Sequence, residues 1–346
     1  MTAGMHMGGV VLTGHGGAEC LEWRDDLTVP NPAAGEVLIR VGAAAVNNTD
    51  INTRRAWYSK AGSAASDASW SGSPIAFPRV QGIDACGTIT SVGAGVDPAR
   101  VGQRVLVEPC LREAGGVLLD RPWFLGSECD GGFADYLTVA ARHAHTIDSA
   151  LSDTEIASFP CSYSTAENML TRSGVLTDDR VLITGASGGV GSAAVQLVRA
   201  RGAVPVAVST AAKAERLVEI GAETVLGRDD TYGENGFDVA IDLVGGAGFS
   251  RLIDAVRPGG RIATAGAVAG AGATVDLRTI YLKDISIFGC TVLDDGVFAG
   301  LVEHIEAGRI TPLVAEVYPL RALAAAQEAF FARGHVGKIA IAVADA

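Results

Sequence analysis

Hydrophobic residues in the first part of the chain, from residue 8 to about 150, fall in short runs that glycine and proline interrupt. Runs of this length and spacing are typical of β-strands. No stretch between them has the period of a crossover helix, so the sequence predicts an antiparallel, partly closed sheet. The predicted strands are GVVLTG (9–14), EVLIRVGAAAV (36–46), ACGTITSVG (85–93), QRVLVEP (103–109) and ADYLTVA (134–140).

The pattern changes after residue 176, where short apolar runs alternate with stretches of helical period. This alternation indicates parallel strands that right-handed crossover helices cover on both faces. The sequence therefore predicts a doubly wound parallel sheet of the α/β class. The predicted strands are 180–185, 204–210, 223–227, 237–245, 261–267 and 285–292, and the predicted helices are 192–202, 212–222 and 249–260.

Two helices and a strand are predicted from about residue 294 onward, and the last strand, GKIAIAV, is expected to return to the first domain. A chain of 346 residues is also too long for one ordinary core. We therefore expect one domain formed by residues 1–160 and completed by 294–346, and a second domain formed by 161–293.

Charge and composition narrow the possible partners. The formal net charge of −12 argues against a nucleic acid or an anionic membrane as a partner. There is no apolar run of about eighteen residues and no export signal at the N-terminus, so we expect a cytoplasmic protein with no membrane partner. Six cysteines without a CxxC pair are typical of reduced thiols.

The first strand of the predicted parallel sheet ends in GASGGVGS, residues 185–192, and a helical stretch follows. Glycine permits a tight turn and lets the backbone approach a pyrophosphate, while the helix start offers unpaired N–H groups to it. Because strand, loop and helix follow at the right intervals, we predict that Ser187, Gly188, Gly189 and Val190 bind a dinucleotide. The alternative is a glycine-rich turn without a ligand.

The end of the next strand indicates which dinucleotide is bound. An NAD site has a carboxylate about twenty residues after the glycine loop, where it holds the ribose hydroxyls. This chain has Ser209 and Thr210 there, followed by Lys213, and these groups suit a 2′-phosphate that a carboxylate would repel. Arg228 is expected to stack on the adenine or to complete the phosphate site. The predicted cofactor is NADPH, although Lys213 and Arg228 could also be ordinary surface cations.

Further motifs are GGFADYLTV (131–139), DLVGG (242–246), RPGGRIATAG (257–266) and HVGKIAIAV (335–343). Together with the glycine loop, they resemble the medium-chain dehydrogenase/reductase superfamily over essentially the whole chain. Within it, the zinc-free quinone oxidoreductase and enone reductase branch is the most similar. The resemblance implies a GroES-like first domain, a Rossmann second domain and NADPH-dependent hydride transfer to a quinone or an α,β-unsaturated carbonyl.

The alcohol dehydrogenases of this superfamily hold a catalytic zinc, and the resemblance indicates which positions would supply its ligands. The cysteine of their C-x-T-D pattern corresponds to Asn47, and the histidine of their G-H-E pattern corresponds to Ile83. At most Cys161, in CSYST, and Asp84 keep a ligand type. Because a catalytic zinc normally has three protein ligands, we predict no metal and expect Cys161 to pack as a small apolar residue beside the nicotinamide.

Without a metal, the negative charge that develops on the substrate oxygen needs another donor. In the zinc-free branch, the segment that here reads NNTDINTRRAWYSK lines this site. By resemblance, Asn47 contacts the nicotinamide ribose and Tyr58 faces the substrate, while Asn52 replaces a second tyrosine. We therefore predict Tyr58 and Asn47 as catalytic residues, with packing on the rim of the loop as the alternative for Tyr58.

The resemblance also assigns the other cofactor contacts. Thr165 is expected near the cofactor, and Lys338 is expected to approach it from the return strand. The strand 285–292 is where this family often joins two sheets, which implies a homodimer. The remaining predicted contacts are Leu243 and Val244 at the ribose, Ala265, Gly266 and Ala267 at the carboxamide, and Gly289 and Cys290 closing the pocket.

Two other functions stay open from the sequence: an alcohol dehydrogenase of the same superfamily, and a non-enzymatic NADPH-binding protein. The substrate is not identified, because the segments 58–74 and 111–129, which are expected to shape its pocket, contain no recognisable motif.

Overall fold

The computed structural model describes residues 4–59, 74–332 and 334–343, and the chain divides into two compact units. Unit 1 consists of Met1–Cys161, Pro312–Gly334 and Lys338–Ala346. Unit 2 consists of Ser162–Thr311 and His335–Gly337.

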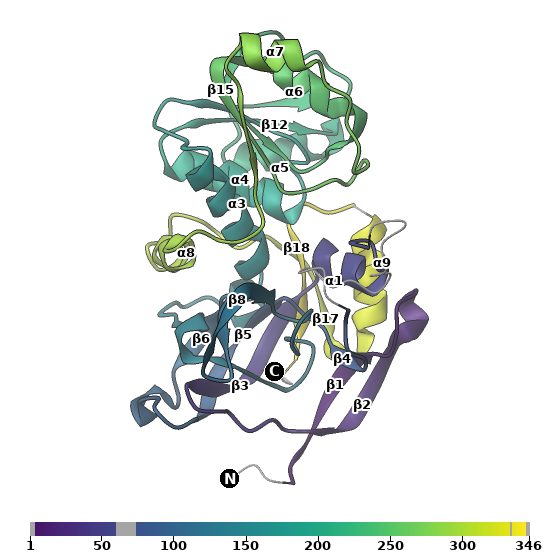
Figure 1. Cartoon of the computed structure of the whole chain (residues 1–346), viewed down its shortest axis with the longest axis vertical. Coiled ribbons are helices and arrows are strands. Elements are labelled where there is room, and N and C mark those ends of the chain that lie inside the picture. Colours follow the sequence, from purple (N-terminus) through teal and green to yellow (C-terminus); the bar gives the residue numbers. More distant parts are fainter. Residues whose placement is uncertain (1–3, 60–73, 333, 344–346) are drawn as a thin grey trace. The chain divides into compact units, whose positions relative to one another are not determined.

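Unit 1 is mainly antiparallel β-structure, which confirms the fold predicted for the first domain (Figure 1). Its described strands form a seven-stranded sheet, a three-stranded sheet in the order β2-β1-β4, and the hairpin β7-β8. The large sheet has the order β10-β6-β5-β3-β18-β17, and β9 also pairs with β3. The elements are β1 (His6–Leu12), β2 (Leu21–Thr28), β3 (Glu36–Ala45), α1 (Asn48–Arg54), β4 (Arg79–Val80), β5 (Asp84–Val92), β6 (Arg104–Val107), β7 (Cys110–Ala114), β8 (Val117–Phe124), β9 (Tyr136–Ala140), β10 (Ala144–Thr146), α2 (Asp153–Ile156), β17 (Val314–Pro319), α9 (Leu323–Ala332) and β18 (Lys338–Ala342).

Strand β3 is the centre of unit 1. Successive side chains of a strand point to opposite faces, and here both faces are covered. Leu38 and Ala44 belong to one apolar cluster, whereas Val37 and Ile39 belong to another. This is why the sequence of β3 is almost continuously apolar. Both neighbours of its last residues come from distant parts of the chain, since Ala45 pairs with Asp84 of β5 and with Ala340 of β18.

Unit 2 contains a parallel sheet of six described strands in the order β13-β12-β11-β14-β15-β16. This is the strand order of dinucleotide-binding folds, with its switch point between β11 and β14. Helices α4 and α5 lie on one side of the sheet and α6 and α7 on the other (Figure 1). The elements are α3 (Pro160–Arg172, which begins in unit 1), β11 (Arg180–Ile183), α4 (Gly189–Ala200), β12 (Val204–Ser209), α5 (Ala214–Glu219), β13 (Thr224–Gly227), β14 (Phe237–Asp242), α6 (Phe249–Ala255), β15 (Val256–Thr264), α7 (Leu277–Leu282), β16 (Ser286–Gly289) and α8 (Val297–Glu306).

These strands confirm the predicted doubly wound sheet, but one helix is shorter than predicted. The sequence predicted a helix over 249–260, whereas α6 ends at Ala255 and β15 begins at Val256. Val256 pairs with Phe237 of β14 ahead of a register shift, so the strand begins before Pro258 instead of after it. The longest described helix, α3, has 13 residues, and no described helix is long and apolar enough to cross a membrane.

The segment 294–311 differs from the predicted domain limits, because it groups with unit 2 and not with the first domain. Side chains of α3 explain this. The Asn168 amide donates to the carbonyl oxygen of Val292 (3.0 Å) and accepts from the backbone N–H of Asp294 (3.0 Å). The Tyr163 hydroxyl donates to the carbonyl oxygen of Thr311 (2.9 Å). The chain therefore enters unit 1 again only at Pro312.

Candidate active site

The glycine loop of unit 2 connects β11 to α4 at the carboxyl edge of the sheet. Gly185 has a φ of +61°, which favours glycine. A Cβ on Gly191 would lie 2.3 Å from the carbonyl oxygen of Gly185 and 2.6 Å from the Cα of Ala186, so no larger residue fits there. The loop thus packs tightly against the start of α4, and the first N–H groups of a helix are able to bind an anion. Ser187, Gly188, Gly189 and Val190 all lie in this turn.

The end of β12 brings further predicted cofactor residues to the same edge. Ser209, its last residue, is 2% exposed, and its hydroxyl has no hydrogen-bond partner in the part of the chain that the structure describes. A buried hydroxyl without a partner is uncommon and fits a ligand group. Lys213 follows after Thr210, and its Nζ lies 3.4 Å from the hydroxyl oxygen of Ser187. Arg228 comes directly after β13 and is exposed.

The loops after β14 and β15 lie against each other. A Cβ on Gly266 would lie 2.5 Å from the carbonyl oxygen of Leu243, and the backbone N–H of Ala269 donates to the carbonyl oxygen of Val244 (2.8 Å). Ala265 donates its N–H to the carbonyl oxygen of Asp242 (3.1 Å). The predicted ribose and carboxamide contacts therefore lie side by side, a set comprising Leu243, Val244, Ala265, Gly266 and Ala267.

The remaining predicted cofactor contacts of unit 2 lie at the end of β16, the strand next to β15, or on α3. Gly289 ends β16, and Cys290 donates its N–H to the carbonyl oxygen of Thr264 at the end of β15 (2.9 Å). Thr165 lies on α3 and is half-buried. Most of the predicted cofactor residues of unit 2 thus lie at one edge of one sheet, where ligands bind in folds of this type. They come from the glycine loop and from the ends of β12, β14, β15 and β16.

In unit 1 the sequence Asn47 to Asp50 turns from β3 into α1. Asn47 is 6% exposed, and its backbone N–H donates to Oδ2 of Asp50 (2.9 Å). Oδ1 of Asp50 accepts from the backbone N–H of Ile83 (3.1 Å). Burial, together with the negative charge of Asp84, raises the pKa of Asp50 to about 7, although the two backbone donors oppose this. A carboxyl group that titrates near neutral pH thus lies directly beneath Asn47.

Asn47, Asp84 and Lys338 form a buried cluster that the sequence did not reveal. The Lys338 ammonium donates to Oδ1 of Asn47, to Oδ2 of Asp84 (2.9 Å) and to the carbonyl oxygen of Val46 (3.0 Å). Asp84 Oδ2 also accepts from the Asn47 amide nitrogen (2.7 Å), and Asp84 Oδ1 accepts from the backbone N–H of Cys161 (2.7 Å). The three N–H bonds of Lys338 are therefore directed to acceptors of unit 1, and the approach of Lys338 to a cofactor stays a prediction.

Tyr58 follows α1 and is half-buried. Its hydroxyl lies 3.5 Å from the amide nitrogen of Asn52 and also has a hydrogen bond with the side chain of Thr49. Burial raises the pKa of the phenol above its usual value, so the group stays protonated and can donate. Trp57 packs edge-on against its ring, with centroids 5.3 Å apart. Asn52 and Thr49 were not predicted as hydrogen-bond partners of Tyr58. The only signal in the sequence is that the two residues are three positions apart, a spacing that places them on one face of a helix.

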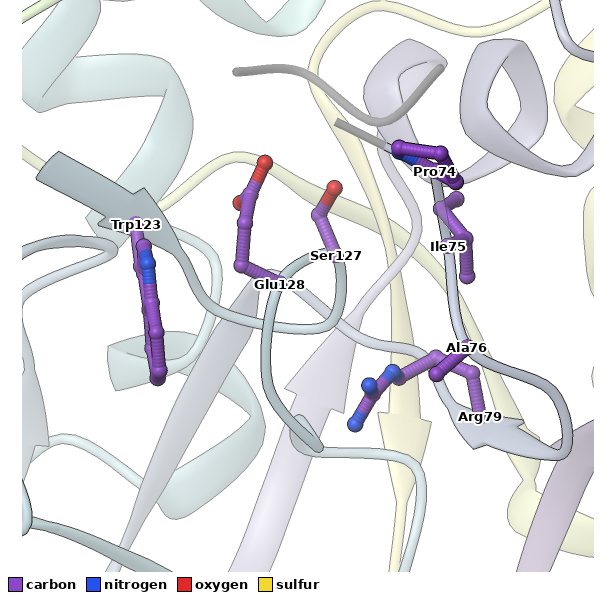
Figure 2. Close-up of a pocket in the computed structure, with 7 residues that line it drawn as sticks. All are labelled: Pro74, Ile75, Ala76, Arg79, Trp123, Ser127 and Glu128. Carbon is purple, nitrogen blue, oxygen red and sulfur yellow. The ribbon is translucent and has the colours of Figure 1, made fainter. Parts of the chain in front are cut away.

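A pocket of about 240 Å³ lies in unit 1 (Figure 2). Trp123 stands on one side and Pro74 and Ile75 on the other, with Ser127 and Glu128 between them (Figure 2). The segment 111–129 thus supplies pocket residues. Of the loop 58–74, residues 60–73 lie outside the described part of the chain.

The residues at the positions of a catalytic zinc do not fit that metal. Asn47 presents an amide and Ile83 an alkyl chain, and the Lys338 ammonium already lies against the oxygen atoms of Asn47 and Asp84. Zinc prefers thiolate, imidazole and carboxylate ligands. Within residues 4–59, 74–332 and 334–343, no group of three or more His, Cys, Asp or Glu side chains is arranged to hold a metal ion.

Two known domain families match the sequence. The family described as alcohol dehydrogenase GroES-like domain matches residues 33–149, and the family described as zinc-binding dehydrogenase matches residues 189–307. The chain is also 29% identical over 332 residues to the quinone oxidoreductase of Homo sapiens, with 90% of each chain covered. It is 29% identical over 348 residues to the acryloyl-coenzyme A reductase of Metallosphaera sedula, with 96% of this chain and 99% of that one covered.

Solved structures give the same result. A Sinorhizobium meliloti protein assigned as an alcohol dehydrogenase superimposes with a TM-score of 0.87 at 41% identity, covering 97% of this chain and 96% of the other. Similarity at this level over both units, with the parallel strand order and the glycine loop at its switch point, confirms the resemblance that the motifs indicated. The chain therefore belongs to the medium-chain dehydrogenase/reductase superfamily, a group of oxidoreductases that bind a nicotinamide cofactor.

Proposed function

We propose that the protein is an NADPH-dependent reductase of quinones or α,β-unsaturated carbonyl compounds. The observation that carries this proposal is the Asn47–Asp84–Lys338 cluster, because it engages Asn47, which corresponds to a metal-ligand position in the alcohol dehydrogenases of the superfamily. An alcohol dehydrogenase uses that metal as a Lewis acid. A conjugated carbonyl depends on it less, because hydride addition to the β-carbon moves charge onto an oxygen that a hydroxyl can stabilise.

Residues at the carboxyl edge of the unit 2 sheet would hold the cofactor, whose bound nicotinamide supplies the hydride. The glycine loop would bind the pyrophosphate, and Ser209, Thr210 and Lys213 the 2′-phosphate of NADPH. Support comes from the buried hydroxyl of Ser209, which has no partner among the described residues, the position of Lys213 at the loop, and the exposed Arg228 after the next strand. A phosphate oxygen would give the Ser209 hydroxyl its missing acceptor.

Residues of unit 1 would act on the substrate. Tyr58 would donate a hydrogen bond to the carbonyl oxygen as charge develops on it, and either Tyr58 or water would then protonate the α-carbon. Its raised pKa supports a donor role, because the phenol is neutral at physiological pH. The Asn47 side chain, held by its hydrogen bonds to Lys338 and Asp84, would lie against the nicotinamide ribose.

The test is a substrate screen that follows NADPH oxidation with quinones, enones and aldehydes, repeated with NADH. We expect turnover with at least one quinone or enone, and faster turnover with NADPH than with NADH. Reduction of NADP⁺ by simple alcohols without any enone activity would favour the second candidate, an alcohol dehydrogenase. That candidate is supported by the 41% identity to the Sinorhizobium protein. Tight NADPH binding with no turnover of any of these compounds would favour a non-enzymatic binding protein.

We also propose that two copies associate through the outer edge of the unit 2 sheet. Strand β16 ends the sheet, so one row of its backbone groups is unpaired within the described chain. Exposed apolar side chains accompany this edge: Ile287 on the strand and Leu277, Tyr281 and Leu282 on α7. A homodimer would cover both features, and light scattering on the purified protein tests it.

A further inference from the structure

Lys338 is a buried lysine with a buried partner. Its side chain is 2% exposed, and that of Asp84 is fully enclosed. Lysine is seldom buried, because removal of an ammonium group from water is unfavourable unless oxygen atoms replace its hydration. Here three oxygen atoms do so, one each from Val46, Asn47 and Asp84.

The two charges of the pair determine how the Asn47 amide is oriented. Its oxygen faces the Lys338 ammonium, while its nitrogen donates to Asp84 (2.7 Å) and to the carbonyl oxygen of Ala45 (3.3 Å). A flipped amide would set its NH₂ group against the ammonium and its oxygen against the carboxylate. Only one of the two orientations is therefore favourable, and each of the two charges disfavours the other.

The same pair connects four parts of unit 1 that are distant in sequence. Val46 and Asn47 follow β3, Asp84 begins β5, Lys338 begins β18, and the Cys161 backbone N–H that Asp84 binds lies at the start of α3. A buried ion pair stabilises a fold little more than a well-packed apolar pair of equal size. A contribution to stability alone is therefore a weak explanation for a charged pair at this place.

We propose that Lys338 is an internal cation that, with Asp84, positions the Asn47 amide at the active site. It binds to a set of oxygen atoms of the kind that hold small hard cations. Lys338 is a positioning residue, because all its donors point into the protein. The inference rests on the proposed function in one step only, namely that Asn47 faces the nicotinamide. The first experiment does not depend on that step, because it measures Tm and not turnover.

The first experiment asks whether the three oxygen atoms form a cation site. Lys338→Ala removes Cγ, Cδ, Cε and Nζ, and n-propylammonium restores that set of atoms. We expect n-propylammonium chloride to raise the Tm of Lys338→Ala above its value in equal sodium chloride, through binding to the folded state alone. Wild type and Lys283→Ala should not respond. Lys283 is a suitable control because its ammonium donates to the backbone carbonyls of Ile253 and Asp254, with no carboxylate among these partners. An equal response in all three proteins would overturn the cation site.

The second experiment separates positioning from folding by restoring charge balance. Lys338→Met and Asp84→Asn each leave one buried charge without its partner, and the double variant leaves none. We expect the double variant to recover most of the lost Tm, while its kcat stays about tenfold to a hundredfold below wild type, since small displacements of active-site groups have effects of this size. Recovery of both Tm and kcat would show a structural role only. If Lys338→Met fails to fold, Asp84→Asn and the double variant still make this comparison.

Binding of 2′,5′-ADP provides the last control, because its predicted contacts all lie in unit 2. Its Kd should be unchanged in every variant, so a loss of kcat can be assigned to the Asn47 end of the site. A wild-type protein that reduces no quinone or enone would contradict the proposed function, whereas the Tm response to n-propylammonium would still decide the cation site.

Discussion

The Nζ of Lys213 lies 3.4 Å from the hydroxyl oxygen of Ser187, so a cation stands directly over the first turn of the glycine loop. Lys213 comes from the segment after β12, and the last residue of that strand is Ser209, whose buried hydroxyl has no partner in the described ranges of the chain. A cation and a free hydroxyl donor at this edge of the sheet match a phosphate better than they match a ribose hydroxyl.

Replacement of Lys213 and Arg228 by alanine is expected to raise the KM for NADPH and to leave the KM for NADH nearly unchanged. Each charge-assisted hydrogen bond to the 2′-phosphate is worth about 1.5–3 kcal/mol, so a rise of roughly tenfold or more is expected from the loss of one. Initial-rate kinetics with both cofactors measure this. Arg216→Ala is the control, because Arg216 is exposed and paired with Glu219 on the same helix. Equal affinity of the wild type for the two cofactors would contradict the assignment.

Gly191→Ala is expected to destabilise unit 2, and Gly188→Ala is not. A Cβ on Gly191 would overlap the backbone of Gly185 and Ala186, whereas a Cβ on Gly188 would have its nearest neighbour at 3.5 Å, an ordinary contact. We expect Gly191→Ala to lower the free energy of unfolding by roughly 2–4 kcal/mol, as overpacking against backbone does. Urea unfolding of both variants without cofactor tests this, and similar values for the two would contradict the loop geometry.

Tyr58→Phe is expected to lower kcat by about ten- to a thousandfold with little change in NADPH binding, if the hydroxyl stabilises charge only in the transition state. Steady-state kinetics with the best quinone or enone from the screen measure the loss. Trp57→Phe is the matched control, since Trp57 packs on the Tyr58 ring and is 47% exposed. Full activity of Tyr58→Phe would remove the tyrosine from the mechanism and make water the proton donor.

The purified protein is expected to contain no stoichiometric zinc, and Cys161→Ala is expected to keep its activity. The ligand positions carry Asn47 and Ile83, and the link from Cys161 to Asp84 uses the Cys161 backbone N–H, which alanine also has. Loss of the thiol should therefore reduce stability by only about 1 kcal/mol. Metal analysis and thermal unfolding test this prediction. About one zinc per chain, removed by a chelator together with the activity, would overturn it.

Asp50 is expected to make the protein less stable as the pH rises through the window from about 4 to 7. Its pKa is about 7 in the folded state and 3.8 in its reference state, so the folded protein keeps a proton that the unfolded chain has already lost. The side chain at position 50 of Asp50→Asn cannot titrate, so the variant should lack this loss of stability with rising pH. One unit of pKa shift corresponds to about 1.4 kcal/mol, so wild type should lose up to about 4 kcal/mol relative to the variant across the window. Urea unfolding from pH 5 to pH 8 tests this, and a constant difference between the two proteins would contradict it.

Local patterns in the sequence were sufficient for the fold class, and they also indicated most of the residues that are proposed to bind the cofactor. The alternation of apolar strands and helices after residue 176 predicted the doubly wound sheet, because buried parallel strands must be apolar on both faces. The glycine loop was also visible, since it occupies seven consecutive residues in which the φ angle of Gly185 and the close contacts of Gly191 favour glycine. Strands with many exposed or charged positions, such as β2 and β17, were missed because they lack that apolar signal.

Only the tertiary structure revealed the Asn47–Asp84–Lys338 cluster and the partners of Tyr58. Asp84 and Lys338 are 254 positions apart, and they meet because β5 and β18 both pair with the end of β3. A sequence pattern reports the preferences of neighbouring residues, whereas the partner of a buried charge is decided by which strands lie next to each other. The sequence could therefore identify Lys338 as a residue of interest. The fold decided that its three donors point into the protein.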